Sequence, residues 1–263
     1  MMNLLIFNLR IDNHHPVLGF KIDWVEKLSK KFNKVFIITT ELKKNDLPKN
    51  VIIFPLYLKK KNNSKIFLLF RFYKYLIKLL FFQKKIDLLF FHMTPKYLVL
   101  SYFMLIFLKI KKVLWHTHGN INFIHKIAFY LSDKIFTAGF DNHHVKENNK
   151  ILNTGHGINL ERFSKRKKFK KKNKLKILYL GRFSKIKKID KAILVVNSCF
   201  KSKKYKFTFD LVGTTLNQKD EDHLKDIKKN LITEVSKKYI NFKKPINYKG
   251  TNNLMTKYDI LVN

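Results

Sequence analysis

Short apolar runs alternate with longer helical patterns along most of the chain, and this alternation restricts the fold more than any other feature. The runs are apolar throughout and not only at every second residue, which is typical of strands covered on both faces. A repeat of strand, helix and strand predicts a parallel sheet between helical layers. The strands predicted in the first part of the chain cover 3–9, 34–40, 51–56, 87–93, 112–118, 134–138 and 150–155.

A basic segment, 164–174, divides the chain. Nine of its eleven residues are Lys, Arg or Asn, so it cannot bury a core and is predicted to be a solvated linker. Strands are expected again at 175–181, 207–213, 246–250 and 258–263, with helices at 190–200 and 220–236. We therefore predict two Rossmann-like, doubly wound domains, 1–163 and 175–263. The second is expected to be incomplete, because such a domain normally needs more chain.

The charge balance is strongly basic. Fifty-five Lys and Arg face eighteen Asp and Glu, which gives a formal net charge of +37. Such a field attracts phosphates, nucleic acids and acidic lipids. AT-rich codon usage explains the abundance of Lys, Asn, Ile and Phe equally well. Since no helix-turn-helix, zinc-finger or RNA-binding signature is present, no nucleic-acid partner is expected.

The single cysteine, Cys199, excludes an internal disulfide or a cysteine-rich metal site. This usage is typical of the reducing cytosol, and the N-terminal apolar run lacks the basic flank of a signal peptide. A cytoplasmic protein is therefore expected. Cys199 lies near the end of a predicted helix among apolar residues, so we expect it to pack and not to act as a nucleophile.

Two apolar segments raise the question of a membrane. In 66–82 the cations Arg71, Lys74 and Lys78 are spaced three and four apart, which predicts a basic side opposite an apolar side. Such a helix can dock on the anionic inner face of the plasma membrane, or pack on a sheet with its lysines outward, and both alternatives stay open. Segment 97–110 is shorter than the roughly 20 residues needed to cross a bilayer, so it predicts a buried helix.

The stretch "ILYLGRFSKIKKI" contains the clearest candidate site. In an open parallel sheet, ligands bind beyond the carboxyl ends of the strands, where Gly181 allows a close approach to the backbone. Arg182 can grip a phosphate with two nitrogens, and Lys187 can add a point charge. An ordinary turn with surface cations is the alternative.

This stretch resembles glycosyltransferases of family four with the GT-B fold, in which a strand ends in Gly-Arg and a Lys follows five residues after the Arg. Other segments are similar to family motifs in the same order: "VLGF" (17–20), "LWHTHG" (114–119), "TGHGINLERF" (154–163), "FDLVGTT" (209–215) and "INYKGTNNLMTKYDILVN" (246–263). The sequence departs from the family at Lys188 and Thr215, where the family has glycines. The family's two-glutamate segment would follow residue 263, so we expect the chain to be C-terminally truncated.

The resemblance implies a retaining transfer of sugar from a nucleotide-sugar to a glycan or lipid-linked acceptor in surface polysaccharide synthesis. Arg182 and Lys187 would hold the donor diphosphate, and His118 would be the catalytic histidine beside the transferred sugar. The glycines implied at the substrate cleft are Gly19, Gly181, Gly213 and Gly250. The alternative is a non-catalytic basic protein that binds nucleic acid or an anionic membrane.

No cofactor and no metal are implied. His116 and His118 alternate in a predicted strand, and with His92 they suggest a metal site on spacing alone. No carboxylate or cysteine accompanies them, so a metal is not expected. His14 and His15 are assigned no role. Asp12 either lines the cleft or is an ordinary loop carboxylate.

Overall fold

The computed structural model describes residues 1–58, 63–82, 85–117, 121–139, 149–163, 174–201 and 206–262. The chain forms two compact units. The first contains Met1–Asn13 and Phe20–Ile158, and the second contains His14–Gly19 and Asn159–Asn263. The predicted linker lies almost entirely outside the described residues, so the domain boundaries stay a prediction.

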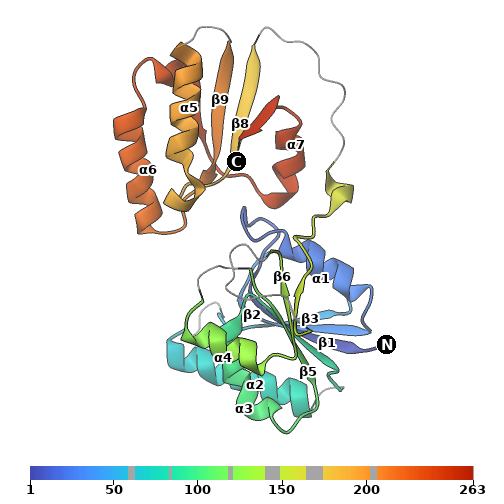
Figure 1. Ribbon diagram of the computed structural model, residues 1–263. Coiled ribbons are helices and arrows are strands. Elements are labelled where there is room, and N and C mark those ends of the chain that lie inside the picture. The colour runs from blue at the N-terminus through green and yellow to red at the C-terminus, as the bar shows by residue number, and fades with distance from the viewer. Residues whose placement is uncertain are drawn as a thin grey trace. The chain divides into compact units, whose positions relative to one another are not determined.

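The first unit is built on a seven-stranded parallel sheet with the order β3-β2-β1-β4-β5-β6-β7 (Figure 1). Its strands are β1 (Asn3–Ile11), β2 (Lys34–Leu42), β3 (Val51–Pro55), β4 (Leu88–His92), β5 (Lys111–Trp115), β6 (Lys134–Thr137) and β7 (Ile151–Asn153). The direction of winding reverses between β1 and β4. A reversal of this kind opens a crevice beyond the carboxyl ends of the two strands.

Helices cover both faces of this sheet, because side chains along each strand alternate between the faces. On one face α1 (Lys21–Ser29) packs against Leu4 and Ile6 of β1. On the other, Leu5 and Phe7 of β1 pack beneath three helices. These are α2 (Lys65–Phe81), α3 (Pro95–Leu105) and α4 (Phe123–Leu131), seen together on one side of the sheet in Figure 1.

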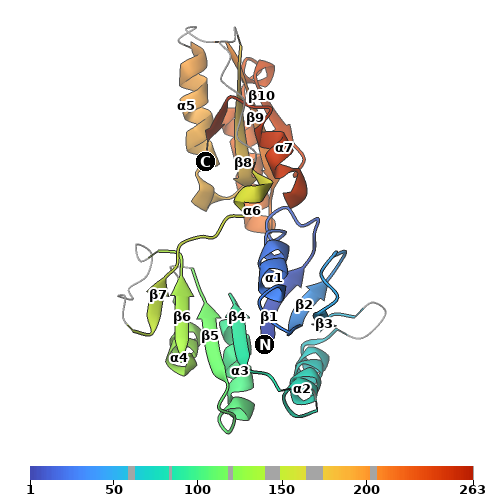
Figure 2. The same ribbon diagram turned by 90° about the vertical axis from the view of Figure 1, so that its right-hand side faces the viewer.

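The second unit has a four-stranded parallel sheet with the order β10-β9-β8-β11. Its strands are β8 (Leu175–Arg182), β9 (Phe207–Thr214), β10 (Ile240–Lys243) and β11 (Ile260–Val262). The helices α5 (Ile189–Lys201) and α6 (Gln218–Leu231) lie on one face (Figure 1). The short α7 (Thr251–Met255) lies on the other, which is turned toward the viewer in Figure 2. The predicted α/β class with two Rossmann-like sheets is confirmed.

An aspartate immediately before a strand clamps that strand to its neighbour at three places. The backbone N–H of Asn3 donates to the Asp87 carboxylate at 2.8 Å, and the N–H of Asp87 donates to the Asn3 carbonyl at 3.0 Å. The same reciprocal pair of bonds joins Asp133 to Lys112 and Asp259 to Lys176. Each clamp sets the register at the amino end of a parallel pair, opposite the end where ligands bind.

The prediction of a strand at 246–250 was wrong. Residues Tyr248–Gly250 form a 3-10 turn (η4), which the Asn247 side chain closes by accepting from the N–H of Gly250 at 2.8 Å. The edge strand of this sheet is instead β10, Ile240–Lys243. Its residues alternate between apolar and polar, so β10 lacks the continuous apolar run by which the buried strands are recognised.

The spacing predicted that the cations of α2 share one outer side, and this prediction was wrong. Arg71 is buried, and its guanidinium donates to the Leu56 carbonyl and, at 3.0 Å, to the Asn63 side chain. The outward side instead shows Phe70 and Ile77 beside exposed lysines. Burial of the guanidinium satisfies a carbonyl at the end of β3, a contact that helical spacing cannot reveal.

Two further expectations on burial were wrong. The helix expected to be buried within 97–110 has an exposed side, with Phe103 and Phe107 open to solvent. Cys199 is exposed as well, although it was expected to pack. Among the described residues, no helix is both long and apolar enough to cross a membrane.

Candidate functional site

The carboxyl ends of β8 and β9 meet at two paired glycines, Gly181 and Gly213. A Cβ atom on Gly213 would lie 1.9 Å from the Gly181 carbonyl oxygen, so only glycine fits there. A Cβ on Gly181 would make ordinary contact with the Tyr179 ring, at 3.4 Å from its hydroxyl oxygen. Gly213 is therefore required by strand packing, whereas Gly181 is not.

Arg182 is the last residue of β8 and lies at this edge. Its Nε donates to the Ser184 hydroxyl at 3.1 Å and lies 3.8 Å from a carboxylate oxygen of Asp220. About a third of the side chain is exposed, at 33%. Within the described ranges the two terminal guanidinium nitrogens have no hydrogen-bond partner. One side of the guanidinium is thus held in place while its fork is available to an anion.

Asp220, which sequence reasoning missed, is itself fixed by the start of α6. Its N–H donates to the Asn217 side chain at 2.9 Å, the usual arrangement of a helix N-cap. Its carboxylate accepts from the N–H of Leu216 at 3.3 Å. The capping pattern of Asn217 was visible in the sequence, but its proximity to Arg182 was not, because the two residues belong to different strand–helix units.

Lys187 and Lys188 follow on a single 3-10 turn, η2 (Lys185–Lys187). Lys187 is exposed, and its N–H donates to the Ser184 carbonyl at 2.9 Å. Lys188 has a φ of +48°, a left-handed conformation that favours glycine. The structure thus explains in physical terms why a glycine suits the position at which this sequence has Lys188.

The remaining predicted glycines lie in two separate turns. Gly250 precedes α7, and a Cβ there would lie 3.1 Å from the Asn247 side-chain oxygen. Gly19 ends the loop before α1, and a Cβ there would lie 2.7 Å from the His15 carbonyl oxygen. Gly250 is not part of the Gly181–Gly213 pair, because it lies after β10, on the connection to α7.

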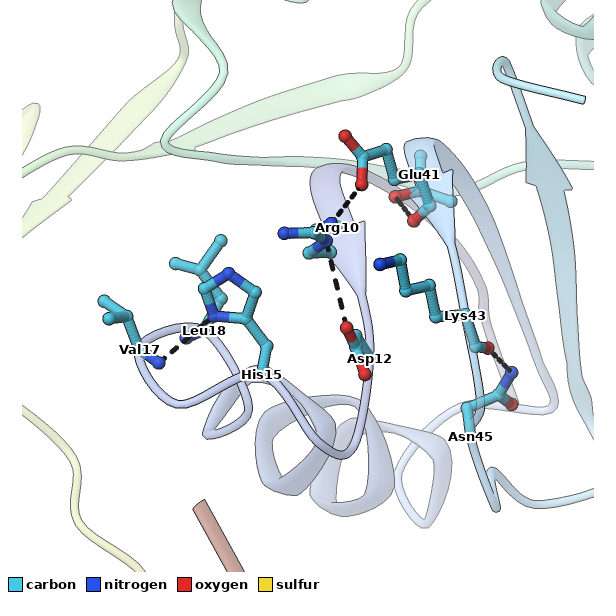
Figure 3. Close-up of polar contacts among 9 residues, drawn as sticks. Arg10, Asp12, His15, Val17, Leu18, Glu41, Lys43 and Asn45 are labelled. Carbon is cyan, nitrogen blue, oxygen red and sulfur yellow. Dashed lines mark hydrogen bonds and ion pairs between the residues drawn. The ribbon is translucent and has the colours of Figure 1, made fainter. Parts of the chain in front are cut away.

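His15 has a structural role that the sequence did not reveal. Its Nδ1 accepts hydrogen bonds from the backbone N–H groups of Leu18, at 2.9 Å, and Val17, at 3.1 Å (Figure 3). Its carbonyl accepts from the N–H of Gly19 at 3.0 Å. The imidazole therefore holds the backbone of the loop in the conformation that leads into α1.

The end of β1 carries a group of charged side chains (Figure 3). Arg10 pairs with Glu41 of β2, and its Nε lies 3.9 Å from a carboxylate oxygen of Asp12. Asp12 is buried and lies directly after β1. The guanidinium partly neutralises this carboxylate, which favours a structural role for Asp12 over the lining of a cleft.

A buried lysine lies at the start of α1, next to the carboxyl half of β1. The ammonium of Lys21 donates to the Asn8 side-chain oxygen at 2.7 Å, and the residue is only 4% exposed. Burial lowers the pKa of Lys21 to about 8. Within the described part of the chain, no carboxylate pairs with it. In a sequence so rich in lysine, nothing marked this one as unusual.

His92 lies beside Lys21, at the end of β4. Burial, and secondarily the charge of Lys21, lower the pKa of His92 to about 3, so its imidazole is neutral. Its ring packs against Trp24 at 5.0 Å and stacks on Trp115 at 6.4 Å. Lys21 and the neutral His92 are therefore buried together, against the rings of Trp24 and Trp115.

A cavity of about 340 Å³ lies on the sheet face that carries α3 and α4. Its lining includes Leu9, Met93, Thr94, Tyr97, Asn122 and His125. Met93 has a φ of +56°, which is uncommon for a residue with a side chain. A cavity of this size, with a largely apolar lining and a few polar groups, suits a small polar group with an apolar attachment.

The predicted catalytic residue, His118, lies outside the described residues, and its role stays a prediction. His116 is buried and packs edge-on to His125, with ring centres 4.6 Å apart. The described residues contain no group of three His, Cys, Asp or Glu that could hold a metal ion.

Two α/β units, each built on a parallel sheet, are typical of the GT-B fold, and this chain has that fold. Among solved structures, the chain is similar to a glycosyltransferase from Rickettsia africae (16% identity, TM-score 0.66, covering 99% of this chain and 72% of that one). It is also similar to WaaG, a glycosyltransferase involved in lipopolysaccharide biosynthesis (13%, 0.60, 98% and 74%). A third is UDP-GlcNAc 2-epimerase from Neisseria meningitidis bound to UDP-GlcNAc (16%, 0.56, 99% and 77%). No family model and no curated protein matches the sequence.

Proposed function

We propose that the chain is a glycosyltransferase that moves a sugar from a nucleotide-sugar to a glycan or lipid-linked acceptor. The observation that carries the proposal is the available fork of Arg182 at the carboxyl end of β8, with Lys187 on the next turn. Breaking the bond between sugar and diphosphate leaves negative charge on the departing nucleotide. Fixed cations beside that oxygen stabilise the charge as it develops.

The structural neighbours support the donor class. Two are named glycosyltransferases, and the third was solved with a UDP-linked sugar. A glycosyltransferase of family four would retain the anomeric configuration, with His118 beside the transferred sugar. Surface polysaccharide synthesis is the process that we propose for it, because one neighbour is involved in lipopolysaccharide biosynthesis.

The acceptor side of the proposal rests on the first unit. The cavity beside Met93 has room for a sugar or a headgroup, and its lining is largely apolar. A separate point concerns metal ions. The cationic side chains at the donor site would balance the negative charge of the leaving nucleotide in place of a divalent ion. We therefore expect transfer to continue in the presence of EDTA.

Titration calorimetry with UDP and GDP tests the donor grip. Arg182→Ala should weaken binding by about tenfold to a hundredfold, because a charge-assisted bidentate contact is lost. The matched control is Lys185→Ala, which removes an exposed cation from the same turn. Equal affinity for the nucleotide in the two variants would contradict the assigned site.

Product analysis separates transfer from isomerisation, which the epimerase neighbour makes the second candidate. With UDP-sugars and a bacterial glycolipid fraction, a transferase releases UDP only when the acceptor is present. An epimerase converts the nucleotide-sugar without any acceptor. Nucleotide binding without either reaction would favour a non-catalytic protein.

A further inference from the structure

The layer formed by α2, α3 and α4 presents aromatic side chains to solvent. Phe70 on α2 is 66% exposed, Phe103 on α3 is 81% exposed, and Phe107 just after α3 is 84% exposed. Phe123 and Tyr130 of α4 are exposed too. We call these five residues and the exposed Ile77 the aromatic face. A soluble protein rarely leaves so many large apolar groups together without a partner.

The three helices form a continuous layer, so the aromatic face is one surface. The hydroxyl of Tyr73 on α2 donates to the carbonyl of Leu100 on α3 at 3.0 Å, and the ring of Phe72 stacks on Tyr97 at 5.2 Å. α3 and α4 pack along each other and share one core with α2 (Figure 1). Their inner sides cover the sheet, which leaves the aromatic side chains outward.

The charges on this layer all have one sign. Exposed Lys74, Lys96 and Lys126 lie one on each helix, among the aromatic residues. No Asp or Glu occurs in α2, α3 or α4, and the only acidic residue between 47 and 132 is Asp87. The Asp87 carboxylate accepts from the backbone N–H of Asn3. A surface of aromatic rings with interspersed lysines matches the boundary between anionic headgroups and acyl chains.

We propose that the aromatic face docks on a bilayer containing anionic phospholipid. A second copy of this chain is a poor occupant, because two molecules of formal charge +37 repel each other. The surface also adjoins the cavity beside Met93, since Asn122 and Ile124 of its lining flank Phe123. Docking would therefore bring a lipid-linked substrate to the cavity, a consequence that rests on the proposed function, although the docking itself does not.

Vesicle co-sedimentation of the full chain, without donor or acceptor, tests the aromatic part. Vesicles of phosphatidylcholine with phosphatidylglycerol should bind the native protein. Replacing Phe70, Phe103 and Phe107 together by Ser should lower the partition by about a hundredfold, because three rings no longer insert. These side chains are exposed, so thermal unfolding should be unchanged.

The control removes three other exposed apolar groups: Ile186→Ser, Val195→Ser and Val235→Ser in the second unit. It should bind vesicles like the native protein. Unchanged binding in the phenylalanine variant, or an equal loss in the control, would overturn the proposal. Loss of self-association in the phenylalanine variant, with no vesicle binding by the native chain, would identify a second copy as the occupant.

A second vesicle experiment tests the lysines that lie among the aromatic residues. Lys74→Gln, Lys96→Gln and Lys126→Gln together should lower the partition to anionic vesicles by about a hundredfold, since each cation at such a surface contributes about fivefold. Binding to pure phosphatidylcholine should hardly change. Failure of either arm leaves the nucleotide-binding test of Arg182 untouched, so docking and transfer can be rejected separately.

Discussion

A methyl group on Gly213 would lie 1.9 Å from the carbonyl oxygen of Gly181, closer than any non-bonded contact allows. We expect Gly213→Ala to destabilise the protein by about 3 kcal/mol or more, because β8 and β9 must separate to accept it. Gly157→Ala is the control, since a Cβ there meets nothing within 4 Å. Denaturant unfolding checks both, and similar midpoints for the two variants would contradict the close approach.

Replacing Lys188 by glycine should stabilise the protein. Its φ of +48° is a conformation that costs a residue with a side chain about 1 kcal/mol. Lys188→Gly should therefore raise the free energy of unfolding by up to about 1 kcal/mol, less the entropy that glycine adds to the unfolded chain. Lys185→Gly, in the same turn without a positive φ, should destabilise. A melting temperature lowered equally by both changes would count against this account.

Lys21 should make stability depend on pH in an unusual direction. Its pKa is about 8 in the folded protein, against an ordinary value of 10.5 for a lysine in the unfolded chain, so the unfolded chain binds the extra proton between these values. Stability should rise as the pH rises through that window, and the full penalty of about 3 kcal/mol applies below it.

Lys21→Met should remove this slope and stabilise the protein at pH 7. The control is Lys27→Met, an exposed position on the same helix. Unfolding curves between pH 7 and about 9.5, compared as differences from the native protein, avoid the ionisation of tyrosine. A Lys21→Met variant that is less stable than Lys27→Met at pH 7 would show that the ammonium is well solvated.

Asp220 should act on the nucleotide only through Arg182, whose Nε lies 3.8 Å from its carboxylate. Asp220→Ala should weaken UDP binding by about threefold to tenfold, because the guanidinium is no longer held at one side. In an Arg182→Ala background the same change should have little effect. Calorimetry on the four proteins of this double-mutant cycle measures the coupling, and additive losses would exclude the positioning role.

The fold was largely readable from the sequence, because buried parallel strands are apolar throughout. The edge strand β10 escaped this pattern, since one of its faces meets water and its residues alternate. Helical spacing predicted α2 but placed Arg71 outward. The position of the Leu56 carbonyl, directly after β3, decides the burial of Arg71, and helical spacing carries no information about that contact.

The candidate site was readable only in part. Gly181 and Arg182 stand out because a glycine and a cation follow a buried strand directly. Asp220, Lys21 and His15 carry no such mark, since their roles depend on which segments meet after folding. The assignments of Lys187 and His118 to the substrate remain predictions from the family resemblance.

The aspartate clamps carry a consequence for the order of folding. Asn3 and Asp87 are 84 residues apart, and Lys176 and Asp259 are 83 apart. In each sheet the first strand pairs on one edge with the next strand along the chain, β2 or β9. Its other edge waits for a partner, β4 or β11, that leaves the ribosome much later. Loop closure over such lengths is slow, and this edge stays unpaired in the meantime. We expect both units to complete folding late in translation and to rely on chaperones until the aspartate clamps have formed.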